Sequence, residues 1–214
     1  MDGVALLSGG LDSGVAAACF AAQPDGRLRA ALFCDYGQRA AAPELEKATA
    51  LAARLDVELH RYELPWLAAL AARSGAALVE GGGALPTSSA DATGDEASAR
   101  AVWVPARNAV LVSVAGALAE TVGADCVIAG FNREEAATFP DNSRAFLQAA
   151  TAFLGLGTRA GLEVVSPTLE WDKERIVAEA LRMGFGPADF WSCYEGGDAP
   201  CGRCESCVRS RFSR

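Results

Sequence analysis

The sequence predicts an α/β protein built on an open, doubly wound and mostly parallel β-sheet. Short apolar runs of strand length alternate with longer helical stretches along most of the 214 residues. A glycine-rich turn follows the first apolar run directly, and four cysteines lie close together near the C-terminus. Because strand–helix–strand units join parallel strands through a right-handed crossover, this alternation favours a parallel sheet. We therefore expect one α/β domain in residues 1–185 and a small cysteine-containing subdomain in residues 186–214.

The individual elements are predicted from the length and periodicity of their apolar residues. Apolar runs too short for helices predict strands at 4–7, 29–34, 56–62, 125–130 and 162–167. Longer stretches, several of them opened by proline or closed by glycine, predict helices at 14–22, 43–55, 64–77, 109–122, 144–156 and 172–183. Residues 80–100 lose this periodicity, so we expect a lid or a disordered loop there.

The turn at residues 8–13 reads Ser-Gly-Gly-Leu-Asp-Ser and lies between the first strand and the first helix. Backbone N–H groups converge at such a turn and the helix dipole adds positive partial charge, so the segment predicts an anion site. Gly9 and Gly10 let the main chain approach a phosphate, and the two serines add hydroxyl donors. Asp12 is a candidate to hold a phosphate-bound Mg²⁺. The turn matches neither the Walker A nor the Rossmann fingerprint.

Composition and charge restrict the class of protein. The net charge of −8 argues against a broad nucleic-acid-binding surface, because such a surface is basic. No apolar stretch is long enough to span a bilayer, and the sequence predicts no signal peptide. We expect a cytoplasmic protein, whose seven cysteines are therefore not a disulfide framework. The single histidine, His60, lies in a strand-like run and is expected to be structural.

Four of the cysteines follow the pattern C-x₇-C-x₂-C-x₂-C, at Cys193, Cys201, Cys204 and Cys207. Thiolates at two-residue gaps converge readily on one ion, and four sulfurs close a tetrahedral shell around Zn²⁺. Such an ion would be structural, because it would fix a C-terminal segment with few apolar residues. An iron–sulfur cluster, which also takes four cysteines, and free thiols are the alternatives.

Several segments together resemble the ATP pyrophosphatases and, within them, the 7-cyano-7-deazaguanine synthase family. They are residues 8–13, 35–39 (Asp-Tyr-Gly-Gln-Arg), 104–108 (Val-Pro-Ala-Arg-Asn), 130–132 (Gly-Phe-Asn) and the C-terminal cysteine pattern. The resemblance covers nearly the whole chain. It implies a sheet of the adenine-nucleotide alpha hydrolase type and a homodimer, while the net charge of −8 predicts no stable nucleic-acid partner.

The resemblance also implies a reaction, in which 7-carboxy-7-deazaguanine and ammonia give 7-cyano-7-deazaguanine at the expense of ATP. A carboxylate is a poor electrophile, so its oxygen is first adenylated and AMP becomes the leaving group for ammonia. A second activation, at the amide oxygen, permits dehydration to the nitrile. Catalysis of this kind consists mainly of positioning and electrostatic stabilisation, with ATP and Mg²⁺ in the site and Zn²⁺ as the structural ion.

The same resemblance assigns expected roles to individual residues. The residues expected to bind ATP are Ser8, Gly9, Gly10, Leu11, Asp12, Ser13, Tyr36, Gln38 and Arg39. The residues expected to take part in catalysis are Asp12, Ser13 and Arg107, whose guanidinium suits phosphate oxygens. The residues expected to bind the base are Asn132, Phe139 and Asp141, which offer a stacking ring and a carboxylate for a guanine-like N–H edge.

Several of the residues singled out have a purely structural alternative. Arg107 is also placed to form an ion pair at a helix entry, and residues 36–39 also suit a tight turn around Gly37. Glu134 and Glu135 could hold ammonium or a metal ion, or simply be solvated.

The chain departs from the family pattern at three places. Gly14 and Ala40 replace a common Ser/Thr and a common His, and residues 135–144 retain only the aromatic-Pro-Asp part of the usual substrate loop. The substrate is therefore less firmly predicted than the reaction type. A related ligase for a different carboxylate, a tRNA-thiolating pyrophosphatase and a non-catalytic nucleotide-binding or zinc scaffold are the alternatives.

Overall fold

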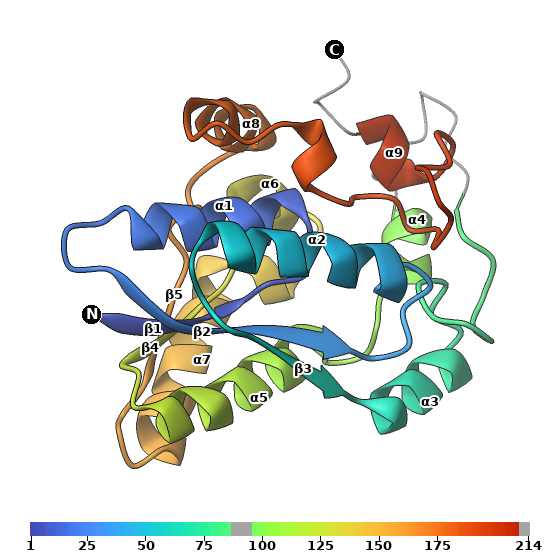
Figure 1. Cartoon of the computed structure of the whole chain (residues 1–214). Helices are drawn as coiled ribbons and strands as arrows, with labels where there is room; N and C mark the ends of the chain where they lie inside the picture. The colour runs from blue at the N-terminus through green and yellow to red at the C-terminus, as the bar shows by residue number, and fades with distance from the viewer. Residues whose placement is uncertain (87–95, 210–214) are drawn as a thin grey trace.

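The computed structural model describes residues 1–86 and 96–209, and its centre is a five-stranded parallel sheet (Figure 1). The strand order is β3-β2-β1-β4-β5, and every neighbouring pair is parallel. The order reverses between β1 and β4, which places a topological switch point there. The strands are β1 (Asp2–Leu6), β2 (Arg27–Asp35), β3 (Leu59–Glu63), β4 (Cys126–Ile128) and β5 (Glu163–Val165). The expected α/β class with a doubly wound parallel sheet is confirmed.

Helices cover both faces of the sheet. In Figure 1, α1, α2 and α8 lie on one side of the strands, and α5 and α7 lie on the other. The helices are α1 (Leu11–Ala21), α2 (Ala41–Arg54), α3 (Pro65–Arg73), α4 (Glu96–Ala101), α5 (Arg107–Val122), α6 (Arg133–Ala136), α7 (Arg144–Gly157), α8 (Lys173–Arg182) and α9 (Glu205–Arg209), with 3-10 turns η1 (Pro140–Asn142) and η2 (Pro187–Asp189).

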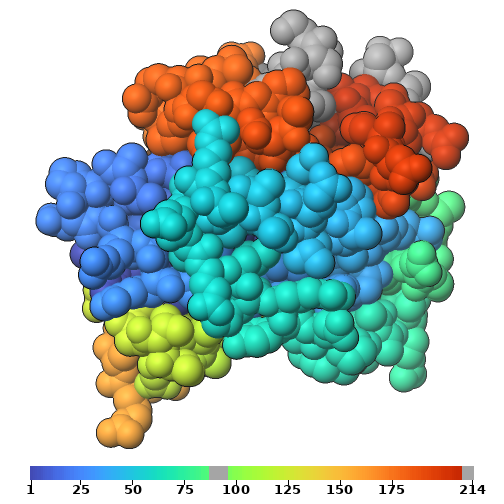
Figure 2. Space-filling model, viewed as in Figure 1, coloured from blue at the N-terminus to red at the C-terminus, as the bar shows by residue number. Residues whose placement is uncertain are grey.

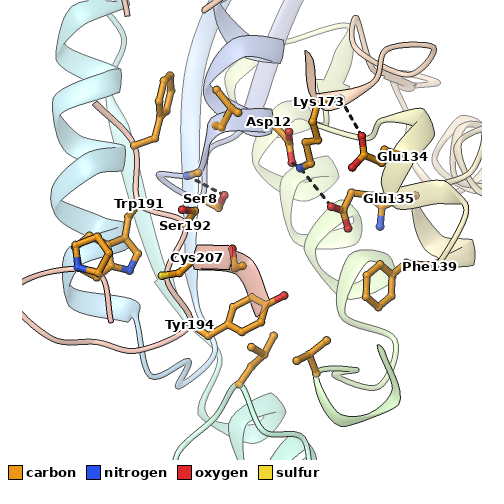
Figure 3. Close-up of a pocket in the computed structure, with 18 of the residues that line it drawn as sticks. Ser8, Asp12, Glu134, Glu135, Phe139, Lys173, Trp191, Ser192, Tyr194 and Cys207 are labelled. Atoms are coloured by element: carbon orange, nitrogen blue, oxygen red, sulfur yellow. Dashed lines mark hydrogen bonds and ion pairs between the residues drawn. The ribbon is translucent and has the colours of Figure 1, made fainter. Parts of the chain in front are cut away.

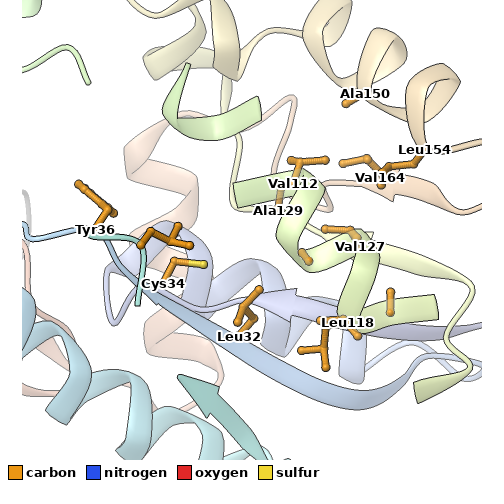
Figure 4. Close-up of a cluster of buried hydrophobic side chains, with 14 of the residues drawn as sticks. Leu32, Cys34, Tyr36, Val112, Leu118, Val127, Ala129, Ala150, Leu154 and Val164 are labelled. Carbon is orange, nitrogen blue, oxygen red and sulfur yellow. The ribbon is translucent and has the colours of Figure 1, made fainter. Parts of the chain in front are cut away.

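The sheet separates two apolar cores because successive strand side chains point to opposite faces. Val4 and Leu32 belong to the core beneath α5 and α7, part of which is drawn in Figure 4. Their neighbours Ala5 and Phe33 belong to the core beneath α1, α2 and α8. Burial on both faces explains why the strands are continuous apolar runs rather than alternating ones.

The C-terminal segment lies against the α1 and α2 side of the sheet. Figure 2 shows α8 and the residues after it, in orange and red, as a continuous cover over this layer. The Trp191 backbone N–H donates to the Gly9 carbonyl at 2.9 Å, and the Phe190 ring packs over Gly14. A Cβ on Gly14 would lie 2.8 Å from that ring, so the departure from Ser/Thr at this position accompanies the aromatic packing.

Several expected boundaries were wrong. Helix α1 begins at Leu11 instead of 14, because extended Gly10 is its N-cap and the end of the glycine-rich turn is already helical. Helix α3 ends at Arg73 instead of 77, because Gly75 takes φ +79° and stops the alanine-rich pattern. Strand β3 begins at Leu59 rather than 56.

The stretch at residues 80–100 was predicted as one loop. Its last part forms the short helix α4, and residues 87–95 lie outside the described part of the chain. Among the described helices, none combines the length and the apolar character that crossing a bilayer requires.

Candidate active site

A cavity of about 530 Å³ opens at the switch point, over the carboxyl ends of β1 and β4 (Figure 3). The loops that follow these two strands touch at Gly130, where a Cβ would lie 2.6 Å from the Ser13 backbone nitrogen. Glycine is therefore required there to bring the two loops together. The cavity is lined by residues of the glycine-rich turn, of the loops before α5 and after β4, of α8 and of the cysteine segment.

The turn at residues 8–13 keeps its expected strand–turn–helix context. Gly9 has φ +78°, a conformation that glycine adopts without strain, and Gly10 is the extended N-cap of α1. The Ser8 and Ser13 hydroxyls are 3.0 Å apart, and the Ser13 hydroxyl also donates to the Gly10 carbonyl at 3.2 Å. Ser8, Gly10, Leu11 and Asp12 line the cavity, so the N-terminus of α1 faces it. This arrangement provides the converging amides and helix dipole of an anion site.

Lys173 is a feature of this site that the sequence reasoning missed. It is the first residue of α8, and its ammonium contacts the Asp12 carboxylate and, at 3.3 Å, a Glu135 oxygen (Figure 3). Its backbone N–H donates to Glu134 at 3.3 Å. The available signal was its position, because Asp172-Lys173 opens a helix just after the last strand and therefore lies near the carboxyl edge of the sheet.

Burial and charge oppose each other in this cluster. Burial alone would lower the pKa of Lys173, but the Asp12 and Glu135 carboxylates raise it above its usual value, so the ammonium is cationic. Burial raises the pKa of the Asp12 carboxyl, and Lys173 limits that rise. Asp12 Oδ1 is buried without a hydrogen-bond partner among the described residues, although Oδ2 is paired. An unsatisfied carboxylate oxygen beside an anion site is a suitable ligand for Mg²⁺.

Arg107 is the first residue of α5 and lines the same cavity. Its Nη1 donates to the Tyr36 phenol oxygen at 3.4 Å. Burial would lower the pKa of Arg107, but Tyr36 and the acids Asp141 and Glu44 raise it, so the guanidinium is charged. The preceding Ala106 has φ +53°, which is uncommon for a residue other than glycine and shows that the surrounding structure fixes the start of this helix.

Five expected ATP ligands do not line this cavity: Gly9 and Ser13, which lie within the turn, and Tyr36, Gln38 and Arg39, which follow β2. Tyr36 and Gln38 are buried at the end of β2, where Tyr36 supports Arg107. The Arg39 guanidinium donates to the carbonyls of Ala77 and Gly83, at 2.8 and 3.3 Å, so its partners are main-chain groups. The structure therefore brings the Asp-Tyr-Gly-Gln-Arg block next to the site as support for its wall. Direct contact of these residues with a nucleotide remains a prediction.

Two of the three residues expected to bind the base line the cavity, and the third does not. Phe139 and Asp141 line the cavity, and burial raises the pKa of Asp141 while Arg107 opposes the rise. Trp103, which the sequence reasoning did not single out, lies opposite Phe139 with ring centroids 6.3 Å apart and planes within 14°. Asn132 is fully buried and does not line the cavity; its side-chain oxygen caps α6 by accepting the Glu135 N–H at 2.9 Å.

The four cysteines converge as expected from their spacing. The four sulfurs all lie within 4.8 Å of one another, and the Cys201–Cys207 and Cys193–Cys204 sulfurs are 4.0 Å apart. Sulfurs bound to one zinc ion at about 2.3 Å would be about 3.8 Å apart in a tetrahedron. Backbone N–H groups donate to three of the sulfurs, which stabilises thiolates. The donor set therefore fits a single metal ion.

The cysteine segment also belongs to the cavity wall. Cys207 and the neighbouring Gly202 line the cavity, and Tyr194 reaches into it (Figure 3). Ala40, which replaces the family's common histidine, is buried against Trp191 and this cluster. A metal ion held there would therefore stabilise one side of the site without being in the reaction.

The family model and the curated relatives that match this chain agree on one family. Residues 2–212 match the family model described as queuosine biosynthesis protein QueC. The protein called 7-cyano-7-deazaguanine synthase in Methanosarcina mazei is 41% identical over 98% of this chain and 91% of its own length. The protein of the same name in Desulforudis audaxviator is 44% identical over 98% and 94%.

A solved structure shares the fold at low identity. The U34-tRNA thiolase NcsA from Methanococcus maripaludis, solved with its [4Fe-4S] cluster, superposes with a TM-score of 0.51 and 15% identity. The match covers 86% of this chain and 57% of that one. At this identity the likeness concerns the fold alone.

Proposed function

Since the chain belongs to the family of queuosine biosynthesis protein QueC, we propose that it converts 7-carboxy-7-deazaguanine and ammonia to 7-cyano-7-deazaguanine with ATP in this cavity. The observation that carries the proposal is one cavity in which an anion-binding turn, the Asp12–Lys173 pair and Arg107 lie beside an aromatic pair. An adenylating enzyme for a planar acid needs each of these parts.

The phosphate end of ATP binds at the N-terminus of α1. Backbone amides of the turn and the Ser8 hydroxyl donate to the pyrophosphate oxygens, and the Ser13 hydroxyl, 3.0 Å from that of Ser8, positions it. Lys173 adds a positive charge within reach of the same turn, and Asp12 would hold Mg²⁺ through its unsatisfied oxygen. The metal ion, when bound, neutralises phosphate charge, so the leaving pyrophosphate departs more readily.

Arg107 lies where charge develops during acyl activation. The substrate carboxylate attacks the α-phosphorus of ATP, pyrophosphate leaves, and the acyl adenylate forms. Ammonia then adds to the acyl carbon and AMP departs, which gives the amide. A second ATP adenylates the amide oxygen, and loss of AMP and a proton leaves the nitrile. The charged Arg107 guanidinium stabilises the phosphoryl oxygens in both adenylations, and Tyr36 fixes its orientation.

The deazaguanine base binds at the Trp103–Phe139 wall. Aromatic rings bury a planar base and restrict its orientation. Asp141 is close enough to Arg107 to raise the pKa of the guanidinium. The Asp141 carboxylate lines the cavity and can accept hydrogen bonds from a guanine-like N–H edge. Asn132 supports the loop after β4 in this scheme rather than touching the base.

Zinc is the metal we assign to Cys193, Cys201, Cys204 and Cys207. In an iron–sulfur cluster the four cysteines are divided among two or four irons, so their sulfurs do not all meet around one point, whereas here all four lie within 4.8 Å of one another. The alternatives from the sequence, a ligase for another carboxylate or a tRNA-thiolating enzyme, gain no support beyond the shared fold. The homodimer and the cytoplasmic location stay predictions.

One assay tests this proposal. The purified protein is incubated with ATP, Mg²⁺, ammonium and 7-carboxy-7-deazaguanine, and nitrile and AMP are measured by mass spectrometry. We expect both products, and an Asp12→Ala variant should stay folded but form no AMP. AMP with the amide but no nitrile would show that the second activation does not occur, and the absence of AMP would indicate a different carboxylate substrate. A brown chromophore, or stable binding to tRNA at moderate salt, would favour the thiolation enzyme.

A further inference from the structure

We propose that Glu44 is a positioning residue that joins the phosphate-binding turn to Arg107. Glu44 lies in the first turn of α2 and does not line the cavity. The inference rests on the proposed adenylation function, and it assigns no contact with substrate to this side chain. It gives a buried acid behind the site a part in that reaction.

The main chain of Glu44 packs directly against the turn. A Cβ built on Gly9 would lie 2.2 Å from the Glu44 carbonyl oxygen and 3.1 Å from the Ala48 nitrogen. The first turn of α2 is therefore in van der Waals contact with the backbone that is expected to bind pyrophosphate. A shift of α2 at Glu44 would shift that backbone.

The side chain of Glu44 reaches the end of β2. One carboxylate oxygen accepts a hydrogen bond from the Gln38 amide at 3.0 Å. The same amide group donates to the Cys34 carbonyl at 3.3 Å, and the Gln38 oxygen accepts the Tyr36 backbone N–H at 2.9 Å. Gln38 thus holds Tyr36 in place, and Glu44 holds Gln38.

Tyr36 completes the connection to the cavity. Its phenol oxygen accepts the hydrogen bond from Arg107 at 3.4 Å, on a ring that is buried. The order of contacts is therefore Glu44, Gln38, Tyr36 and Arg107, and only Arg107 faces the substrate. Geometry alone makes Glu44 part of the support for that guanidinium.

The burial of Glu44 and the charges that face it determine the pH at which it supports Arg107 most strongly. Burial raises the pKa of the Glu44 carboxyl to about 7, the Gln38 hydrogen bond and the Arg107 charge oppose the rise, and Asp35 adds to it. Glu44 is consequently neutral in mildly acidic solution and anionic above neutrality. The anion attracts Arg107 and accepts more strongly from Gln38, so positioning should be firmer at the higher pH.

The test compares Glu44→Gln with the matched control Glu46→Gln. The amide introduced by Glu44→Gln keeps an acceptor for Gln38 but never becomes charged, whereas Glu46 is on the same helix with a side chain that is 72% exposed. ATP–pyrophosphate exchange with 7-carboxy-7-deazaguanine is measured between about pH 5.5 and 9 without ammonia, so that ammonia ionisation does not enter. Binding of Mg²⁺ and a non-hydrolysable ATP analogue is measured in parallel by calorimetry.

We expect wild-type exchange to rise through pH 7 and Glu44→Gln to lack that rise. The variant should equal the wild type at pH 6 and be slower by roughly tenfold at pH 8, as expected for a small displacement of a reacting group. Glu46→Gln should follow the wild type. Glu44→Gln that exchanges like the wild type at every pH overturns the proposal, as does an equal loss at pH 6 and pH 8.

Failure of the proposed function gives a different result. If the wild type binds the ATP analogue but exchanges no pyrophosphate, the adenylation function is wrong. The binding data then decide on Glu44, because its role requires analogue affinity to rise through pH 7 in the wild type and not in Glu44→Gln. Flat affinity in both proteins overturns the inference. Glutamine is used at position 44 instead of alanine because it keeps an acceptor for the Gln38 amide, so the comparison does not depend on whether Glu44→Ala folds.

Discussion

Replacement of Gly9 by alanine should impose two costs, a strained left-handed backbone conformation and a steric clash of the new Cβ with α2. Gly9 has φ +78°, and a Cβ there would lie 2.2 Å from the Glu44 carbonyl oxygen. Gly75 has nearly the same conformation, φ +79°, with nothing within 4 Å of its Cβ position. Gly75→Ala is therefore a matched control that carries the conformational cost without the steric one.

The magnitudes follow from these two environments. A left-handed conformation costs a residue other than glycine about 1–2 kcal/mol, which both variants should lose from the free energy of unfolding. In a chain of this size each kcal/mol corresponds to a fall of about 2–4 °C in melting temperature. At Gly9 the contact must also open from 2.2 Å to at least 3.0 Å, so the turn or α2 has to move. A misplacement approaching 1 Å costs about 10²-fold in rate.

The assay pairs thermal unfolding with AMP formation. We expect Gly75→Ala to melt a few degrees lower with wild-type activity. Gly9→Ala should melt lower still and lose about a hundredfold or more of its AMP formation under conditions where it is folded. If Gly9→Ala were as stable and as active as Gly75→Ala, the contact between the turn and α2 would not control the geometry of the site.

Four further predictions test other parts of the molecule. Lys173→Met should reduce AMP formation by about 10² or more while circular dichroism is unchanged, because a charge aimed at the phosphates is lost; a loss under tenfold would contradict its role. Cys204→Ser should lose bound zinc, measured by plasma emission spectrometry, together with folded protein, and a fully active variant would show that no structural metal is needed. Trp103→Ala should raise the KM for the deazaguanine about tenfold and leave the KM for ATP unchanged, since base stacking contributes about 1–3 kcal/mol; an equal rise in both KM values would remove its assignment to the base. Because the pKa of Glu44 is raised to about 7 in the folded state, its stabilising contribution is full below the unfolded value near 4.5 and is lost as pH rises through 7. Urea denaturation of Glu44→Gln should therefore lack that fall in stability, and parallel pH curves for both proteins would show that Glu44 is not responsible.

Much of the architecture followed from local pattern. The five strands, the six helices α1, α2, α3, α5, α7 and α8, and the turn at residues 8–13 could be predicted because apolar periodicity and backbone hydrogen bonding act over a few residues. The cysteine cluster was equally predictable, because its ligands lie on one short stretch. Helix ends were less accurate, since a single residue such as Gly75 stops a helix that the alanine pattern would continue.

The contacts that form the site could not be predicted from local sequence pattern, because they join residues far apart in the sequence. Lys173 is 161 residues from Asp12 in the sequence, and Arg107 is 71 residues from Tyr36. Trp103 meets Phe139 only because the loops before α5 and after β4 end at the same edge of the sheet. Gln38 and Arg39 were expected to face a nucleotide, yet their polar groups are bonded within the protein.

The sequence by itself determined the order of strands and helices along the chain, the anion-binding turn and the metal-binding spacing, because each depends on residues within one or two turns of one another. Tertiary structure alone decided which side chains face the cavity and which support it. The physical reason is that strand order and helix docking, rather than neighbours in sequence, bring the charge of Lys173 to Asp12 and a buried Glu44 behind Arg107.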